Sequence, residues 1–274
     1  MRLFLIFLLI LPILSFSQDT AGIRSIKIHS IILNEDRFFQ VYLPPVSNKN
    51  PDVIYVLDGQ AQFRNVVNAL KQLGQPKIVI GIGNIWLRDR DYTPTHVSPS
   101  RFVDSNAARI SGGGEKFNSH LEKELIPFVE SNYGVGKRRI LIGHSLGGLT
   151  AMNLLLKHNS LFHQFIIIDP SMWWDDCNLL KQTNELLKNV SGQIDLFLAI
   201  ANTANKDKNH IEAIRSDTTI STAQTRPSVI LLDYLKAVSK KIIKIEWKYY
   251  KDENHISVFQ PAVLDGLRFL LYQN

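Results

Sequence analysis

Apolar residues recur along the chain in short runs that are separated by polar and turn-forming residues. The runs occupy residues 53–57, 77–82, 140–142, 165–168, 196–200 and 243–250. Runs of this length are typical of strands that are covered on both faces of a sheet. Between them lie segments with apolar residues three or four positions apart, as at Phe117, Leu121 and Leu125, which predicts amphipathic helices. The alternation of strand and helix predicts right-handed crossovers and a mostly parallel central sheet with helices on both faces.

Both ends of this pattern carry their own signals. Residues 24–29 and 38–43 predict two short strands, the second ending at Pro44 and Pro45, as expected of an antiparallel hairpin at a sheet edge. A final helix is predicted from one apolar stripe, formed by Phe259, Val263, Leu267 and Leu270.

Two stretches depart from the regular rhythm. Pro127 falls inside a helical pattern, and because proline has no N–H group it is expected to kink or restart the helix. Residues 84–114 show little periodicity, which predicts an ordered loop or cap that crosses one end of the sheet.

The N-terminus has the pattern of a secretory leader. Arg2 precedes an apolar run from Leu3 to Leu14, and small residues follow at Ser15 and Ser17. The run is shorter than the roughly 20 residues of a membrane-spanning helix, so no stable membrane anchor is expected. We therefore predict a signal peptide over residues 1–17, a single mature domain over 18–274, and export to the periplasm or the medium.

Composition narrows the class of protein. The chain has 274 residues, of which 45% are hydrophobic and 20% charged, as in globular proteins. The net charge of +6 is scattered rather than gathered in a basic block, which argues against nucleic-acid binding. The single cysteine, Cys177, excludes an internal disulfide framework and a multi-cysteine metal cluster.

The first candidate for chemistry is a G-x-S-x-G sequence centred on Ser145. It directly follows a predicted buried strand and opens a predicted helix, which is the context of a nucleophile elbow. Free amides at that helix start favour negative charge, so the Leu146 N–H is one predicted oxyanion donor. The second is predicted in the Asp58-Gly59-Gln60 turn after residues 53–57, at the Gln60 amide.

A serine nucleophile needs a base, and His255 is the histidine with the expected placement. It follows the last predicted strand and precedes the last predicted helix, in a loop that can reach the elbow. The orienting acid is less well marked. Asp207 is the first carboxylate after residues 196–200, while Asp169 and Glu253 are alternatives, and a Ser-His dyad also stays open.

With these motifs in view, the chain resembles the putative-esterase family of α/β-hydrolases, the esterase-D-like group. It looks closest to the exported siderophore-hydrolase and feruloyl-esterase-like branch. The resemblance runs from about Ser25 to Leu271. Beside the elbow it rests on seven further stretches: residues 57–60, 90–94, 113–114, 124–127, 170–174, 254–257 and 265–267.

The resemblance implies an α/β-hydrolase fold and a serine hydrolase that cleaves carboxylic esters, with Ser145 and His255 at the family's nucleophile and base positions. Neither a metal nor a cofactor is implied, and the expected partner is a small-molecule ester. The family usually places a Glu or Asp near Asn202, so this chain departs from it there.

Substrate contacts are predicted at Trp173 and Trp174, which follow residues 165–168, and at Arg90 in the cap-like segment. Two other functions stay open. One is an acyltransferase that passes the same acyl group to an alcohol, since relatives include mycolyl-type transferases. The other is an exported binding protein that has lost turnover.

Overall fold

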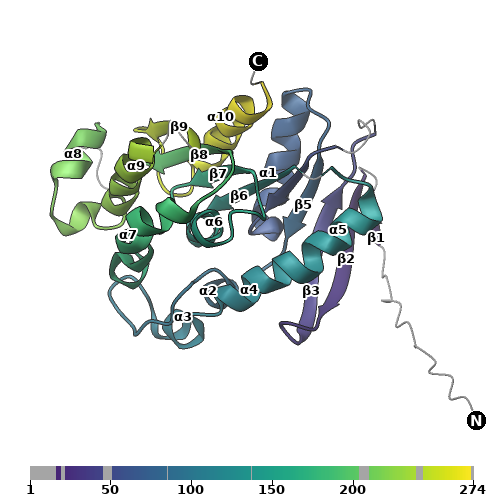
Figure 1. The fold of residues 1–274 in the computed structure, drawn as a ribbon, viewed down its shortest axis with the longest axis horizontal. Helices are drawn as coiled ribbons and strands as arrows, with labels where there is room; N and C mark the ends of the chain where they lie inside the picture. The colour runs from purple at the N-terminus through teal and green to yellow at the C-terminus, as the bar shows by residue number, and fades with distance from the viewer. Residues whose placement is uncertain are drawn as a thin grey trace, which may run out of the picture.

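The computed structural model describes residues 17–19, 22–45, 51–84, 86–136, 138–203, 210–238 and 243–272. Within these residues nine strands form one sheet in the order β1-β2-β3-β5-β4-β6-β7-β8-β9 (Figure 1). The strands are β1 (Ser17–Asp19), β2 (Ile23–Ser30), β3 (Glu35–Tyr42), β4 (Val53–Val56), β5 (Ile78–Ile82), β6 (Arg139–His144), β7 (Gln164–Ile168), β8 (Ile194–Ala201) and β9 (Ile243–Tyr250).

The sheet is mixed, with a parallel majority. Strands β5, β4, β6, β7, β8 and β9 pair in parallel, whereas β1, β2 and β3 pair antiparallel, as does β3 with β5. The predicted mostly parallel sheet and its antiparallel N-terminal hairpin are confirmed. Because the carboxyl ends of parallel strands meet at one edge, the residues that follow β4, β6, β7 and β9 are brought together there.

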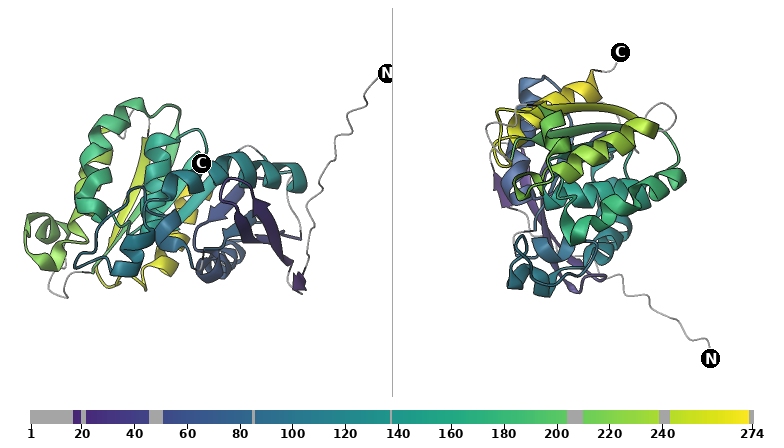
Figure 2. Two further views of the ribbon diagram at one scale, coloured as in Figure 1. Left: turned by 90° about the horizontal axis from the view of Figure 1, so that it is seen from below. Right: turned by 90° about the vertical axis from the view of Figure 1, so that its left-hand side faces the viewer.

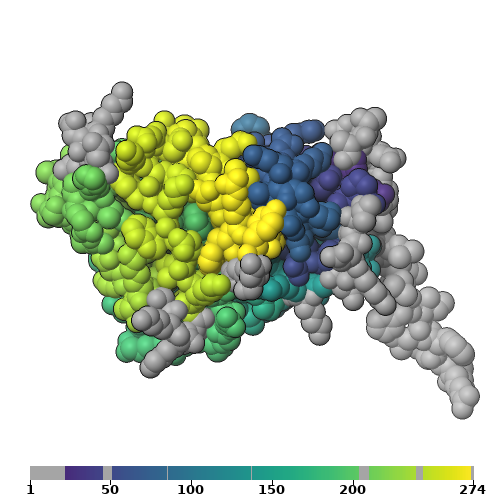
Figure 3. All heavy atoms as spheres, turned by 90° about the horizontal axis from the view of Figure 1, so that it is seen from above, coloured from purple at the N-terminus to yellow at the C-terminus, as the bar shows by residue number. Residues whose placement is uncertain are grey.

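Helices cover both faces of the sheet (Figure 2). On one face α1 (Gly59–Gln72) and α10 (Phe259–Leu271) pack side by side, and Figure 3 shows the yellow of α10 against the blue of α1. The predicted stripe of the last helix is buried on this face with residues of β4, β6, β7 and β8.

The opposite face carries the remaining long helices: α4 (Gly114–His120), the π-helical η1 (Leu121–Leu125), α5 (Ile126–Tyr133), α6 (Leu146–Lys157), α7 (Trp174–Leu186) and α9 (Arg226–Val238). Shorter elements are α2 (Arg88–Asp91), α3 (Ser105–Ile110), η2 (Leu187–Asn189), α8 (Ile211–Ser216) and η3 (Ile220–Thr222). In the left view of Figure 2, α8 and the N-terminal strands lie at opposite ends of the molecule.

Pro127 lies where the helix changes from a π-helical turn back to α-helix, and the helix continues through it. Figure 1 shows α4, η1 and α5 as one continuous rod. Since Pro127 has no N–H to donate to the carbonyl four residues earlier, a regular α-helix would leave that carbonyl unpaired. The chain instead takes one π-helical turn over Leu121–Leu125 and resumes the α-helix at Ile126.

The cap-like segment contains α2 and α3 and is anchored by buried side chains, among them Tyr92 and Val103. Residues 1–16 of the predicted leader lie outside the described residues, and Ser17 begins β1. In the part of the chain that the structure describes, no helix has the length and apolarity needed to cross a membrane.

The carboxylate of Glu124 ties the rod to the N-terminal hairpin. It accepts hydrogen bonds from the Ser30 hydroxyl, from the Ile31 and Ile32 amides, and from Nδ1 of His120 at 2.6 Å. Ser30 and His120 both lie against the same Oε2 atom, so the carboxylate stands between them. This cluster therefore fixes β2 to η1, and His120 is not placed to take the proton of Ser30.

Acid is expected to weaken the fold through this cluster. Burial lowers the pKa of His120, so the folded chain resists a proton that the unfolded chain takes up below about pH 6.5. For Glu124 burial would raise the pKa, but hydrogen bonds from His120, Ser30 and the Ile32 amide outweigh it and lower the pKa below 4.5. Both shifts contribute stability at neutral pH that is lost as the pH falls.

Urea unfolding measured across pH 7 to 3 tests this expectation with Glu124→Gln. At pH 7 the variant should lose roughly 1–3 kcal/mol of unfolding free energy, because a partly buried carboxylate that accepts several hydrogen bonds is replaced by a neutral amide. Its further loss below pH 4.5 should be smaller than that of the parent. Glu122→Gln, on an exposed site of the same turn, is the matched control. Equal acid dependence in Glu124→Gln and the parent would contradict the assignment.

Candidate active site

Ser145 occupies a strained turn between β6 and α6. Its backbone has φ 60° and ψ −122°, a combination that a residue with a side chain rarely adopts. A Cβ placed on Gly143 would lie 2.2 Å from the carbonyl oxygen of Gly147, so only glycine fits two positions before the serine. The Ser145 amide donates to the Ile168 carbonyl at 3.1 Å, which holds the turn against β7. The predicted elbow geometry is present.

The loop after β9 brings His255 to this serine. His255 Nε2 lies 2.9 Å from Ser145 Oγ, a hydrogen bond between residues 110 positions apart. The loop is held by Asn254, whose side-chain oxygen accepts from the Ile256 and Ser257 amides. An imidazole nitrogen at this distance is in reach of the hydroxyl proton.

Asp169 completes a chain of contacts from carboxylate to imidazole to hydroxyl. Its Oδ2 lies 2.6 Å from His255 Nδ1, and its Oδ1 accepts from the Ala201 amide at 3.1 Å. The Asp169 amide donates to Ala199, and the residue is only 6% exposed, so the carboxylate is fixed on both sides. This arrangement orients the imidazole toward the hydroxyl.

The three predicted acids have different outcomes. Asp169, an alternative in the sequence, is the carboxylate on the imidazole, while Asp207 lies outside the described residues. The side chain of Glu253 has no described contact with His255, and its carbonyl instead accepts from the Asn202 amide. The signal for Asp169 is its place directly after β7. His144 pairs with Ile168 in the parallel register of β6 and β7, which sets Ser145 beside Asp169.

His144 contacts both the backbone and the ring of His255. Its Nε2 donates to the His255 carbonyl at 2.7 Å, and the two rings lie 4.6 Å apart. The ring of Phe259 also packs against His144 in a T-shaped contact, with centroids 5.9 Å apart. Burial lowers the pKa of His144 to about 3, with a smaller contribution from His255, so this ring is neutral at physiological pH. Sequence reasoning did not assign a role to His144.

The turn after β4 lies next to the elbow. A Cβ on Gly59 would lie 2.3 Å from the Gly81 carbonyl carbon, so α1 starts in close contact with β5. The Asp58 carboxylate accepts a hydrogen bond from Arg88 Nε at 3.0 Å. Nη2 of the same arginine donates to the His144 carbonyl at 3.3 Å. Arg88 thereby connects this turn to the elbow.

The predicted oxyanion donors sit at the starts of two helices. Gln60 is in the first turn of α1 and Leu146 in the first turn of α6, where amides have no partner within the helix. The Gln60 side chain turns to accept from the Asn84 amide at 2.9 Å. Their role as oxyanion donors stays a prediction.

The chain matches a known protein family over most of its length. The model of the family described as "Putative esterase" matches residues 30–233. The chain belongs to this family. It is therefore an esterase-family hydrolase acting on carboxylic esters, and the resemblance seen in the sequence is confirmed.

The relatives of this esterase include enzymes named for siderophores. The chain is 30% identical to the ferri-bacillibactin esterase BesA of Bacillus subtilis, over 87% of this chain and 86% of that one. It is 25% identical to a siderophore enterobactin esterase of Emericella nidulans, over 82% and 83%. Among solved structures, an IroE-like serine hydrolase from Shewanella oneidensis aligns with a TM-score of 0.79 and 29% identity, covering 92% of this chain and 81% of that one.

A cavity of about 160 Å³ opens beside the serine of this esterase. Its wall consists of Ser145, Asp169, Pro170, Ser171, Trp173, Thr203, Gln224 and His255. Trp173, predicted as a substrate contact, lines this cavity. Trp174 does not: it is 3% exposed and its indole N–H donates to the Thr95 carbonyl, which makes it part of the core that anchors the cap-like segment.

Arg90 is committed to ion pairs within the fold. Its guanidinium donates to both carboxylate oxygens of Glu35 and to Asp91. These ion pairs tie α2, which contains Arg90, to Glu35 of β3, and they leave the predicted substrate contact at Arg90 without structural support. Arg88, two residues earlier, is the arginine that contacts the elbow.

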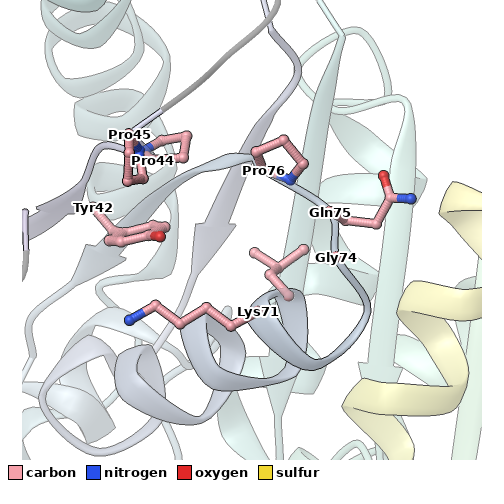
Figure 4. Close-up of a pocket in the computed structure, with 8 residues that line it drawn as sticks. Tyr42, Pro44, Pro45, Lys71, Gly74, Gln75 and Pro76 are labelled. Atoms are coloured by element: carbon pink, nitrogen blue, oxygen red, sulfur yellow. The ribbon is translucent and has the colours of Figure 1, made fainter.

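A separate hollow of about 330 Å³ lies between the end of β3 and the end of α1 (Figure 4). It is lined by Tyr42, Pro44, Pro45, Leu70, Lys71, Gly74, Gln75 and Pro76. None of these pairs a nucleophile with a base, so the hollow is not a second centre of this kind. Across the described residues, no group of three or more His, Cys, Asp and Glu side chains is arranged to hold a metal ion.

Proposed function

We propose that this protein cleaves carboxylic esters through an acyl-enzyme formed on Ser145, with His255 as the base and Asp169 as the orienting acid. The observation that carries the proposal is the continuous chain of contacts from Asp169 Oδ2 through His255 to Ser145 Oγ, at 2.6 Å and 2.9 Å. These three side chains come from three different strand ends, so their convergence is not explained by local structure.

The proposed reaction starts with the imidazole. Asp169 accepts the Nδ1–H of His255, which leaves Nε2 free to take the proton of Ser145 as the hydroxyl attacks the ester carbonyl. The amides of Leu146 and Gln60 stabilise the oxyanion. His255 then protonates the departing alcohol, and water, activated by the same imidazole, hydrolyses the acyl-enzyme and restores the free serine.

His144 is expected to act as a positioning residue in this mechanism. Its N–H holds the His255 backbone, so His144→Phe keeps a ring of similar shape and removes the donor. We expect kcat to fall by about 10–100-fold with KM nearly unchanged, since small displacements of a base have effects of this size. Steady-state kinetics measure this. An unchanged kcat, in a variant whose thermal unfolding matches the parent, would show that the contact is not needed.

For the substrate we propose a siderophore-type ester. The support is the relatives named for ferri-bacillibactin and enterobactin, together with coverage of most of both chains. We also propose export, on the strength of the leader pattern over residues 1–17. The mass of the protein recovered from the periplasm or medium tests this, because processing after Ser17 leaves Gln18 as the first residue.

A hydrolysis screen of the purified protein tests the activity. Short acyl esters, a feruloyl ester and a catechol siderophore lactone are incubated with the parent and with Ser145→Ala, and the acids released are quantified. The proposal expects release from the siderophore lactone that depends on Ser145. A folded parent that releases no acid from any ester would favour the binding-protein alternative. Acyl transfer to an added alcohol in preference to water would favour the acyltransferase.

A further inference from the structure

A second and larger cavity adjoins the catalytic one. It measures about 710 Å³, against 160 Å³ beside Ser145. Trp173 lines both cavities, so a single indole ring forms their common wall. The smaller space suits an ester group and a short chain, whereas cavities of roughly 300–1,000 Å³ hold ligands of several rings. The larger cavity therefore has the volume for a large acyl group, and Trp173 is the residue at which it meets the catalytic cavity.

The wall of the larger cavity is built by two segments. The cap-like segment supplies residues 96–103, and the chain around the start of α7 and the start of α9 supplies Trp173, Asp175, Asp176, Cys177, Ala223 and Arg226. The ring of Phe102 lies 5.5 Å from that of Trp173 at 56°, and Phe102 is 37% exposed. A tilted pair of this kind presents a ring face and a ring edge to a flat aromatic ligand.

Two arginines give this cavity a cationic side. Arg226 donates to the backbone carbonyl of Asp217 and to the Thr222 hydroxyl, which are uncharged acceptors. Arg101 is exposed and forms no ion pair with any residue that the structure describes. Guanidinium groups bind carboxylate and other anionic oxygens in a fixed planar geometry, and they also stack on aromatic rings.

The two acids of the wall compensate only part of this charge. Asp176 is paired with Lys181, and Asp175 accepts from the Asn178 amide group. The cavity therefore has two arginines against one acid that lacks a cationic partner among the described residues. The balance favours a ligand with negative charge.

The same wall holds an unusual run of backbone. Asp175, Asp176 and Cys177 have φ of 51°, 48° and 62°, three consecutive residues with side chains in the left-handed region. Such residues are costly, and they concentrate where a fixed shape is needed for a ligand. The turn sets the wall of this cavity immediately after Trp174.

We propose that this cavity binds an aromatic acyl group that carries anionic oxygens, with Phe102 and Trp173 against its ring and Arg101 and Arg226 toward its charge. The proposal rests on the proposed function, since it assumes that Ser145 attacks the ester attached to that acyl group. It assigns specificity to the cap-like segment rather than to the residues that perform the chemistry.

Three esters of the same alcohol test the subsite: an acetyl ester, a 4-carboxybenzoyl ester, and a 4-carbamoylbenzoyl ester that lacks the charge. Arg101→Gln should raise KM for the carboxybenzoyl ester by about 10-fold, because a charge-assisted contact is lost. It should leave the other two unchanged. Phe102→Ala should raise KM for both aromatic esters and spare the acetyl ester. In the parent, added salt should raise KM for the carboxybenzoyl ester and leave KM for the two uncharged esters unchanged.

Arg109→Gln is the matched control, because Arg109 is an exposed arginine of the same segment that does not line the cavity. If Arg101→Gln and Phe102→Ala have the same KM as the parent for all three esters, the proposed subsite is contradicted while the proposed function stands. If the parent hydrolyses no ester, or if Ser145→Ala hydrolyses them equally well, the proposed function itself fails.

Discussion

Replacing Ser145 by alanine is expected to lower kcat by about 10⁶-fold, which leaves only background ester hydrolysis. The substitution deletes the attacking oxygen and keeps a side chain at φ 60°, so the elbow should fold as before. The affinity for the ester, measured by calorimetry, should survive because the cavity walls are unchanged. Steady-state kinetics on a chromogenic ester measure the loss.

Ser30→Ala is the informative companion to this variant. Ser30 also lies near a carboxylate and a histidine, but its hydroxyl donates to Glu124 and not to an imidazole. The variant should lose stability and keep its kcat. If Ser145→Ala retains the rate of the parent, or if Ser30→Ala abolishes it, the nucleophile has been misassigned.

The second large effect is expected at the acid. Asp169→Asn should lower kcat by about 10⁴-fold, because an amide nitrogen facing His255 Nδ1 would donate to it and force the ring proton onto Nε2. A protonated Nε2 cannot accept the proton of Ser145. The oxygen of the introduced amide can still accept from the Ala201 N–H, so the loop should keep its shape.

Asp207→Asn provides the matched comparison, since Asp207 is the carboxylate that the chain order of the motifs favoured. We expect the kcat of Asp207→Asn to stay near that of the parent. Kinetics of the two variants on one chromogenic ester separate the assignments. A large loss in Asp207→Asn with a mild effect in Asp169→Asn would return the acid to the loop after β8.

The strands were predictable because of their environment. A strand covered on both faces has to be apolar throughout, and β4, β5 and β7 are buried at every position. The elbow was also predictable, since a strand, a glycine-flanked serine and a helix follow one another locally. The convergence of Ser145 and His255 followed from chain order alone.

The acid was harder because it depends on which strands are neighbours. Asp169 reaches His255 only because β7 pairs directly with β6, which sets the residue after β7 beside the elbow. The order of the strands in the sheet cannot be read from the sequence. A carboxylate after β8 and one after β7 therefore had similar standing until the pairing was known.

Of the three predicted substrate contacts, Trp173 lines the cavity beside Ser145, and the places of Trp174 and Arg90 were hard to predict for a related reason. Trp173 and Trp174 are adjacent, yet one lines the cavity while the other is buried, and no periodicity marks which is which before a left-handed turn. Arg90 finds its partner in Glu35, 55 residues away, and a pairing over that distance is not visible in the chain.

Peptide mass spectrometry after brief exposure to a fluorophosphonate tests whether His255 activates Ser145 as the nucleophile. We expect a single adduct on the peptide that contains Ser145, with labelling strongly slowed in His255→Ala and in Asp169→Asn. An adduct on another serine, or equal labelling of Ser145 when His255 is replaced, would contradict it.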